Sequence, residues 1–243
     1  MLQSLAWGFL AASPLIVGGA VALRWRVEER LLGWIMAFGG GVLISAVSFE
    51  LVEEAFDTSS GDRRVALGLV CGSLTFFAGD LLIDRMGGDE RKRSRGKQAE
   101  GSALAIVLGI VLDGIPESIV LGLTIVVSGS ISAAFLVAVV LSNVPETIAA
   151  TTGLAQAGWS RGRVLGLWLM VSLVSALAAV FGFAVFDSAA PSTVAFVLAF
   201  AGGAILTMLA DTMMPEAFEH GGKLVGVLTT IGFGVAFAIS ALD

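Results

Sequence analysis

The chain has 243 residues, of which 56% are hydrophobic and only 14% are charged, and its mean hydropathy is +0.93. A soluble globular domain of this length is far more polar, so the composition excludes that class and predicts a polytopic membrane protein. The single cysteine excludes a disulfide framework, a zinc finger and CxxC redox chemistry. The basic cluster in the polar segment from Met86 to Gly101 could bind a nucleic acid or anionic lipid, but we interpret it as a topology determinant and expect no nucleic-acid partner.

Eight apolar runs follow one another along the chain, each close to the ~20 residues that span a bilayer. They predict an all-α fold of eight transmembrane helices, and the 31 glycines suit helices that pack closely in a membrane. The runs cover residues 5–23, 32–56, 65–83, 103–127, 131–155, 164–186, 194–214 and 224–242.

The basic residues predict the orientation of these helices. If the N-terminus lies outside, every Lys and Arg except Arg63 and Arg64 falls on the cytoplasmic side, as the positive-inside rule requires. We therefore expect a multi-pass protein of the cell membrane with both termini outside the cytoplasm. The first apolar run has no Lys or Arg before it, so we expect it to be retained rather than cleaved as a signal peptide.

Two pairs of similar segments indicate internal symmetry. Residues 37–56 match residues 199–218 at an offset of 162, with identity at seven of twenty positions, and these helices are predicted to cross in opposite directions. The sequences VLDGIPESI at 111–119 and VLSNVPETI at 140–148 match at five of nine positions. Together they predict an inverted 3+3 repeat around two central Pro-kinked helices, the construction typical of secondary transporters.

We expect residues 1–243 to form a single transmembrane transporter domain. Its predicted parts are helices one to three at 5–85, a cytoplasmic linker at 86–101, helices four and five at 102–157, and helices six to eight at 162–243.

Acidic side chains mark the central pair of helices. A carboxylate buried in hydrocarbon costs several kcal/mol, and the spans contain acids but no Lys or Arg, so these acids must be protonated or must bind cations. Pro116 and Pro145 lack an N–H and leave backbone carbonyls without their helical donor. The expected cation site consists of Asp113, Glu117, Ser142, Asn143 and Glu146.

Further acids lie toward the ends of the second and seventh helices, where an entrance or exit route would attract cations. The candidate pathway residues are Glu50, Glu53, Glu54, Asp211 and Glu216, and contact with water at the membrane interface is the alternative reading. Asp80 has the same two readings. The only histidine, His220, is expected to be a solvated residue of the loop after the seventh helix.

At these residues the chain resembles the ZIP family of divalent-metal transporters. That family usually has His-Asn-x-Pro-Glu-Gly on its fourth helix, where this chain has Asp113 to Ser118, and Glu146 matches its fifth-helix Pro-Glu motif. The resemblance implies ligand roles for Asp113, Glu117 and Glu146, with Ser142 and Asn143 weaker, and an elevator-like mechanism without ATP. The sixth helix lacks the family's acid, so a single metal ion is expected rather than two.

The predicted function is therefore transport of a divalent metal ion, with zinc, manganese, iron or cadmium as cargo and with no catalytic cofactor. A site of oxygen ligands suits manganese, magnesium or ferrous iron, although zinc also binds carboxylates. The alternatives are a proton-coupled carrier or channel for another solute, and an intramembrane enzyme. An enzyme is disfavoured because the spans have no basic residue to clamp a phosphate and the chain has one histidine. The expected partners are metal ions and the lipid bilayer, and a homodimer is compatible with this reading.

Overall fold

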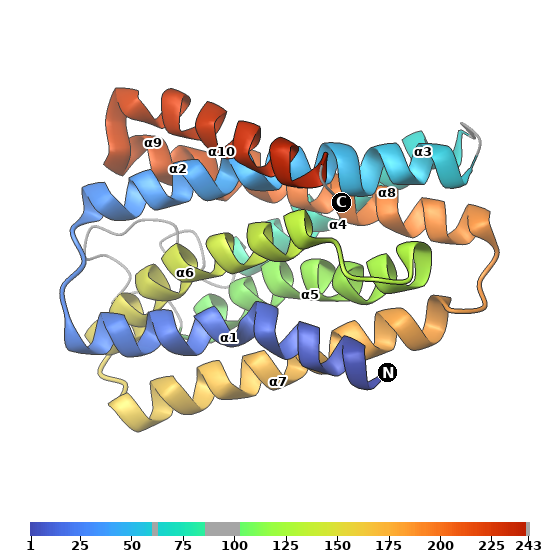
Figure 1. Cartoon of the computed structure of the whole chain (residues 1–243). Coiled ribbons are helices and arrows are strands. Elements are labelled where there is room, and N and C mark those ends of the chain that lie inside the picture. The colour runs from blue at the N-terminus through green and yellow to red at the C-terminus, as the bar shows by residue number, and fades with distance from the viewer. Residues whose placement is uncertain (60–62, 86–102, 242–243) are drawn as a thin grey trace.

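The computed structural model describes residues 1–59, 63–85 and 103–241, and all regular secondary structure in these ranges is helical (Figure 1). The predicted linker at 86–101 lies outside the described residues. The elements are α1 (Leu2–Arg24), α2 (Glu29–Ala46), the π-helical η1 (Val47–Glu53), α3 (Glu54–Thr58), α4 (Arg64–Ile83), α5 (Ala103–Ser128), α6 (Ala133–Gln156), α7 (Arg161–Phe186), α8 (Pro191–Met208), the π-helical η4 (Leu209–Met213), α9 (Met214–Gly221), the short 3-10 helix η5 (Gly222–Leu224) and α10 (Val225–Ser240).

Seven helical stretches of the described residues are long and apolar enough to cross a membrane, which agrees with a polytopic membrane protein. The last stretch, Pro191–Ser240, covers both the seventh and the eighth predicted helix. Gly222, with a φ of 65°, ends α9, and α10 then returns alongside α2 (Figure 1). A side chain at this φ would be strained, so glycine suits the reversal. Eight separate crossings remain a prediction.

The helices pack as two bundles. The first bundle consists of α1, α5, α6 and α7, and the second bundle consists of α2, α3, α4, α8, α9 and α10 with the π-helical turns (Figure 1). The bundles meet mainly where α2 lies against α6 and where α8 lies against α5. Large apolar side chains on the outer faces of α4 and α7, such as Leu74 and Leu177, are exposed, as expected of surfaces that face lipid.

Glycines allow the helices of the second bundle to touch backbone to backbone. A Cβ atom on any of four glycines would overlap a carbonyl group of a neighbouring helix: Gly41 with Thr229, Gly232 with Phe38, Gly203 with Leu69, and Gly72 with Phe200. The first two contacts join α2 to α10, and the other two join α8 to α4. Gly41 and Gly203 differ by 162 in number, as do Phe38 and Phe200, which is the offset of the sequence match.

The two π-helical turns occur at matched places. The turn η1 begins at Val47 and the turn η4 begins at Leu209, again 162 residues apart. Such turns are rare and occur frequently at functional sites. Each therefore interrupts the regular hydrogen bonding of a membrane-crossing helix at the corresponding point of the sequence match.

The two central prolines do not end their helices. The helix α5 runs through Pro116 and α6 runs through Pro145 without a change in helical assignment, and a kink at each proline stays a prediction. Each proline still lacks an N–H, because its ring occupies the backbone nitrogen. The backbone carbonyls of Leu112 and Leu141 therefore lack the N–H donor that a residue other than proline would supply four positions later.

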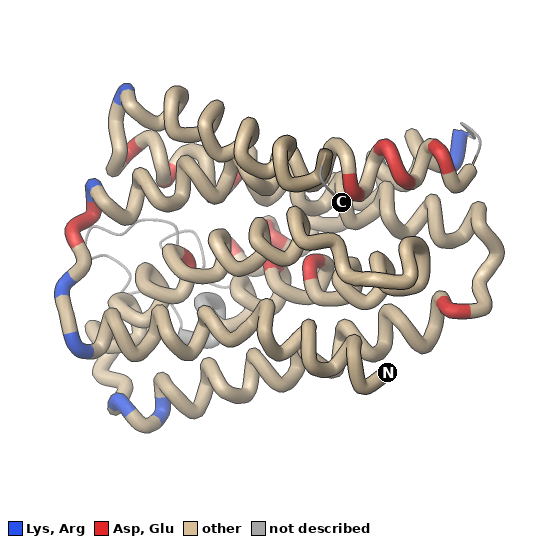
Figure 2. Tube along the Cα trace, viewed as in Figure 1, with Lys and Arg blue, Asp and Glu red and all other residues tan. Residues whose placement is uncertain are grey.

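Basic residues gather at one end of the molecule. Figure 2 places them where α1 meets α2, where α6 meets α7 and where α9 meets α10, with a further basic position beside the start of α4 at the opposite end. The N-terminus lies toward that opposite end (Figure 1). The orientation with both termini outside was predicted from this uneven distribution of Lys and Arg. That orientation in the membrane remains a prediction.

Candidate functional site

A cavity of about 80 Å³ lies between the two bundles. Asp113 on α5 and Glu146 on α6 line it from the first bundle, and Thr212 on η4 and Glu216 on α9 line it from the second. Its remaining lining is mostly apolar and consists of Met36, Gly109, Ile110, Ala149, Ala150 and Met213. A water molecule occupies about 30 Å³ of liquid, so the cavity has room for a cation and one or two waters.

Glu117 lies in a second, much smaller cavity. Its side chain is 3% exposed, and together with Asn143 it lines a space of about 10 Å³ against α1 and α7. The Asn143 amide donates a hydrogen bond to the carbonyl of Ala11 at 3.1 Å, which ties α6 to α1. Ile110 lines both cavities, so the two spaces adjoin at one side chain.

Ser142 connects α6 to Glu117. Its Oγ lies 3.5 Å from Glu117 Oε1 and donates to the carbonyl of Val139 at 3.0 Å. A hydroxyl has one proton, and the shorter contact takes it. The Ser142 oxygen is therefore available to accept a hydrogen bond when the Glu117 carboxyl carries a proton.

The structure divides the five predicted site residues into two groups. Asp113 and Glu146 share the larger cavity, while Glu117, Ser142 and Asn143 meet at the smaller one. Within the described residues, no three His, Cys, Asp or Glu side chains lie close enough to hold one metal ion together. Ligation of a metal by these residues therefore remains a prediction.

The predicted pathway acids have different environments. Glu216 lines the larger cavity, so it lies with the central acids rather than apart from them. Asp211 and Glu53 are exposed, whereas Glu50 accepts a hydrogen bond from Ser240 at 2.6 Å. Glu54 accepts one from Thr58, four residues on, at 3.2 Å.

Asp80, for which burial and an interfacial position were both open, is 6% exposed within α4.

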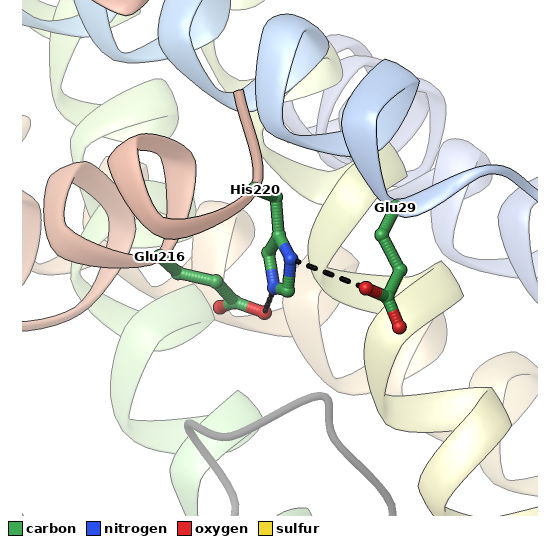
Figure 3. Close-up of polar contacts among 3 residues, drawn as sticks. All are labelled: Glu29, Glu216 and His220. Carbon is green, nitrogen blue, oxygen red and sulfur yellow. Dashed lines mark ion pairs between the residues drawn. The ribbon is translucent and has the colours of Figure 1, made fainter. Parts of the chain in front are cut away.

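The prediction for His220 is wrong. This histidine lies on α9, and its side chain is only 3% exposed. Nδ1 lies 3.6 Å from Glu29 Oε2, and Nε2 lies 4.0 Å from Glu216 Oε1 (Figure 3). Neither Glu29 nor the burial of His220 was expected from the sequence. The offset of 162 aligns His220 with Thr58, which is the last residue of α3 but lies beyond the predicted helix at 32–56.

Comparison with known proteins does not show the family of this chain. The chain matches no family model. It is 29% identical over 222 residues, 89% of its length, to a proposed zinc transporter of Arabidopsis thaliana. The matched region is 35% of that protein, so the chain spans about a third of the relative's length.

Proposed function

We propose that the chain transports divalent metal cations across a membrane and that the cavity between the two bundles is its transport site. The observation that carries this proposal is the placement of carboxylates from both bundles, Asp113 and Glu146 on one side and Glu216 on the other, around one cavity. The likeness to a proposed zinc transporter over most of the chain supports a metal as the cargo. The Pro-Glu motifs support membership of the ZIP family.

Carboxylates in a largely apolar cavity favour a divalent cation for an electrostatic reason. Each ionised carboxylate is costly to keep in a poorly solvated place, and a cation offsets that cost by direct coordination. Asp113 and Glu146 are the ligands from the first bundle, and Glu216 joins them when the second bundle moves closer, because the three carboxylates are too far apart in this conformation to hold one ion. The Thr212 hydroxyl donates its proton to the backbone carbonyl of Met208, so a lone pair of its oxygen can coordinate a metal ion.

Glu117 has a different part in this proposal. It lies beside Ser142 and adjoins the transport cavity through Ile110. A protonated Glu117 would donate to Ser142 when the metal is absent, and an ionised Glu117 would turn toward the cation when the metal is present. Its replacement should therefore affect transport even though it lines the neighbouring cavity.

The two bundles are the units that move in this proposal. Backbone contacts at Gly41, Gly72, Gly203 and Gly232 hold the second bundle together. The approach of α2 to α6 is looser, because a Cβ atom on Gly39 would lie 3.3 Å from the Leu141 carbonyl oxygen. Sliding between the bundles therefore disturbs fewer close contacts than rearrangement within the second one. This supports an elevator-like motion of the metal-bearing bundle.

The matched glycine contacts and the matched π-helical turns also support an inverted repeat and eight crossings. The helix α2 packs on α10 as α8 packs on α4, which relates the second and third crossings to the seventh and eighth. The alternation of inward and outward states then follows from motion of one bundle against the other.

The conformation described is proposed to be open to the cytoplasm. A pocket of about 650 Å³, lined in part by Glu29, Thr152 and Gln156, shares Ala149 with the transport cavity. It lies toward the end of the molecule where α1 meets α2, which carries basic residues (Figure 2). The positive-inside rule assigns that end to the cytoplasm.

Uptake into liposomes tests the proposal. Purified protein should carry zinc, manganese, iron or cadmium into vesicles, and Glu146→Gln should abolish most of that uptake while keeping the size of the side chain. Asp187→Asn is the matched control, because Asp187 is an exposed acid at the end of α7. Absence of uptake of all four metals by the wild-type protein, or full uptake by Glu146→Gln, would falsify the proposed site.

A further inference from the structure

His220 is held between α2 and α9 by close packing. A Cβ atom on Gly33 would lie 2.8 Å from the Cβ atom of His220 and 2.5 Å from the Gly221 nitrogen, so only glycine permits this approach of the two helices. The Trp34 indole donates to the Gly221 carbonyl at 3.2 Å and fixes the end of α9. The imidazole ring of His220 is therefore buried in a fixed position near the end of α9 and is not exposed to solvent.

The two ring nitrogens face two different carboxylates (Figure 3). Nδ1 is directed at Glu29 and Nε2 at Glu216, at the distances given above. In metal sites a histidine that coordinates through one nitrogen almost always donates its other N–H to a carboxylate, carbonyl or water, which fixes the ring orientation. Glu29 is positioned to accept a hydrogen bond from Nδ1–H, and Glu216 is positioned to be a second metal ligand beside Nε2.

We propose that His220 Nε2 and Glu216 form a transit site for a divalent metal ion between the central cavity and the cytoplasmic end, with Glu29 as a positioning residue. The proposal rests on the proposed function. It adds an imidazole ligand to a route whose other predicted side-chain ligands are oxygens.

The distances suit temporary coordination. With metal–ligand bonds of about 2.0–2.2 Å and a tetrahedral angle, the nitrogen and oxygen of two ligands are about 3.4 Å apart. Nε2 and Glu216 Oε1 are 4.0 Å apart, so closure by roughly 0.6 Å brings both onto one ion. Two protein ligands, with water completing the coordination, hold a metal less firmly than the four of a closed structural site. A transit site has to release its ion, and two ligands permit this.

The position of Glu216 places the proposed site on the route. Glu216 lines the central cavity, and His220 lines a pocket of about 420 Å³ together with Glu28, Glu29, Arg30 and Glu219. A metal ion that passes from Glu146 to Glu216 therefore has His220 as its next ligand, and three exposed carboxylates beyond it. Successive carboxylates keep the ion partly neutralised along this path.

Because the chain has one histidine, ring-labelled histidine gives an NMR signal from His220 alone in the full-length protein. Zinc should move the Nε2 resonance strongly and Nδ1 much less. Glu216→Gln should weaken this response at least 10-fold in zinc concentration, and Glu29→Gln should weaken it about 10–100-fold, as loss of an outer-shell acceptor does. Glu29→Gln should also shift the Nδ1 resonance in the absence of metal, because Glu29 lies beside this nitrogen. If Glu29 did not contact the ring, the substitution would leave that resonance unchanged.

Uptake by the same variants separates the two proposals. His220→Gln should slow zinc uptake more than manganese uptake, because imidazole favours zinc over manganese. Asp187→Asn should leave both the resonances and the uptake unchanged. If zinc uptake by the wild type is intact and depends on Glu146 while zinc leaves both ring nitrogens unmoved, the transit site is wrong and the transport site stands. If no metal is taken up at all, the proposed function fails, whatever the resonances do.

Discussion

Substitution of Gly41 or Gly203 by alanine should destabilise the second bundle, whereas Gly226→Ala should not. A Cβ atom at either of the first two positions overlaps a backbone carbonyl of the facing helix, so the helices must move apart by roughly an ångström, an overpacking that costs about 1–3 kcal/mol. Gly226 is on α10, where an added Cβ meets no atom within 4 Å. Alanine there gains only the ordinary helical preference over glycine, about 0.5–1 kcal/mol.

Relative to Gly226→Ala, the free energy of unfolding of Gly41→Ala and of Gly203→Ala should therefore be lower by about 1–3 kcal/mol. For a chain of this length each kcal/mol lowers the midpoint of thermal unfolding by about 2–4 °C, so the expected loss is about 2–12 °C. Tryptophan fluorescence of the purified protein during heating measures it. Midpoints within a degree of the Gly226→Ala value for both variants would refute the backbone contacts. A large loss in only one of them would refute their equivalence in the repeat.

Three further predictions concern transport. Glu117→Gln should lower metal uptake severely, while Ser142→Ala should lower it only a few-fold, because Ser142 contacts Glu117 but donates its proton elsewhere; equal effects in liposome uptake would contradict this order. Asp113→His should shift competition between zinc and manganese toward zinc, since imidazole suits zinc, and an unchanged preference would remove Asp113 from the ligands. Crystals soaked in zinc or manganese should show one anomalous peak in the central cavity, and two adjacent peaks there would disprove the single-ion site.

Hydropathy predicted most of the fold because polar segments separate the first six apolar runs clearly. The fourth run was placed at 103–127 and the helix is Ala103–Ser128, and the sixth was placed at 164–186 and the helix is Arg161–Phe186. The order of the helices and the close packing at glycines followed from the same apolar runs. How the helices pair into two bundles depends on tertiary contacts, which apolar runs do not encode.

The end of the seventh predicted helix was missed for a local reason. The apolar run stops at residue 214, and the proline and charged residues that follow suggested a loop. In the structure Pro215 follows the turn η4 and lies in the first turn of α9, where the missing N–H costs little, so the helix continues to Gly221. His220 and its neighbour Glu216 therefore face the interior. The sequence grouped Asp113 and Glu146 in one predicted site, and both line the larger cavity, but it gave no means of placing Glu117 in a separate cavity.

Thr58 and His220 make the two halves of the molecule chemically unequal. Each lies four residues after a glutamate, and each contacts it: Thr58 with Glu54 and His220 with Glu216. If the proposed inverted repeat is correct, the offset of 162 makes these pairs counterparts, and one end of the proposed route has a hydroxyl where the other has an imidazole. A carrier that consumes no energy cannot use this difference to accumulate metal, because its forward and reverse cycles must reach the same equilibrium. For the proposed transporter, the difference can only set unequal half-saturation concentrations on the two sides of the membrane, and the lower value for zinc is expected on the side that has His220.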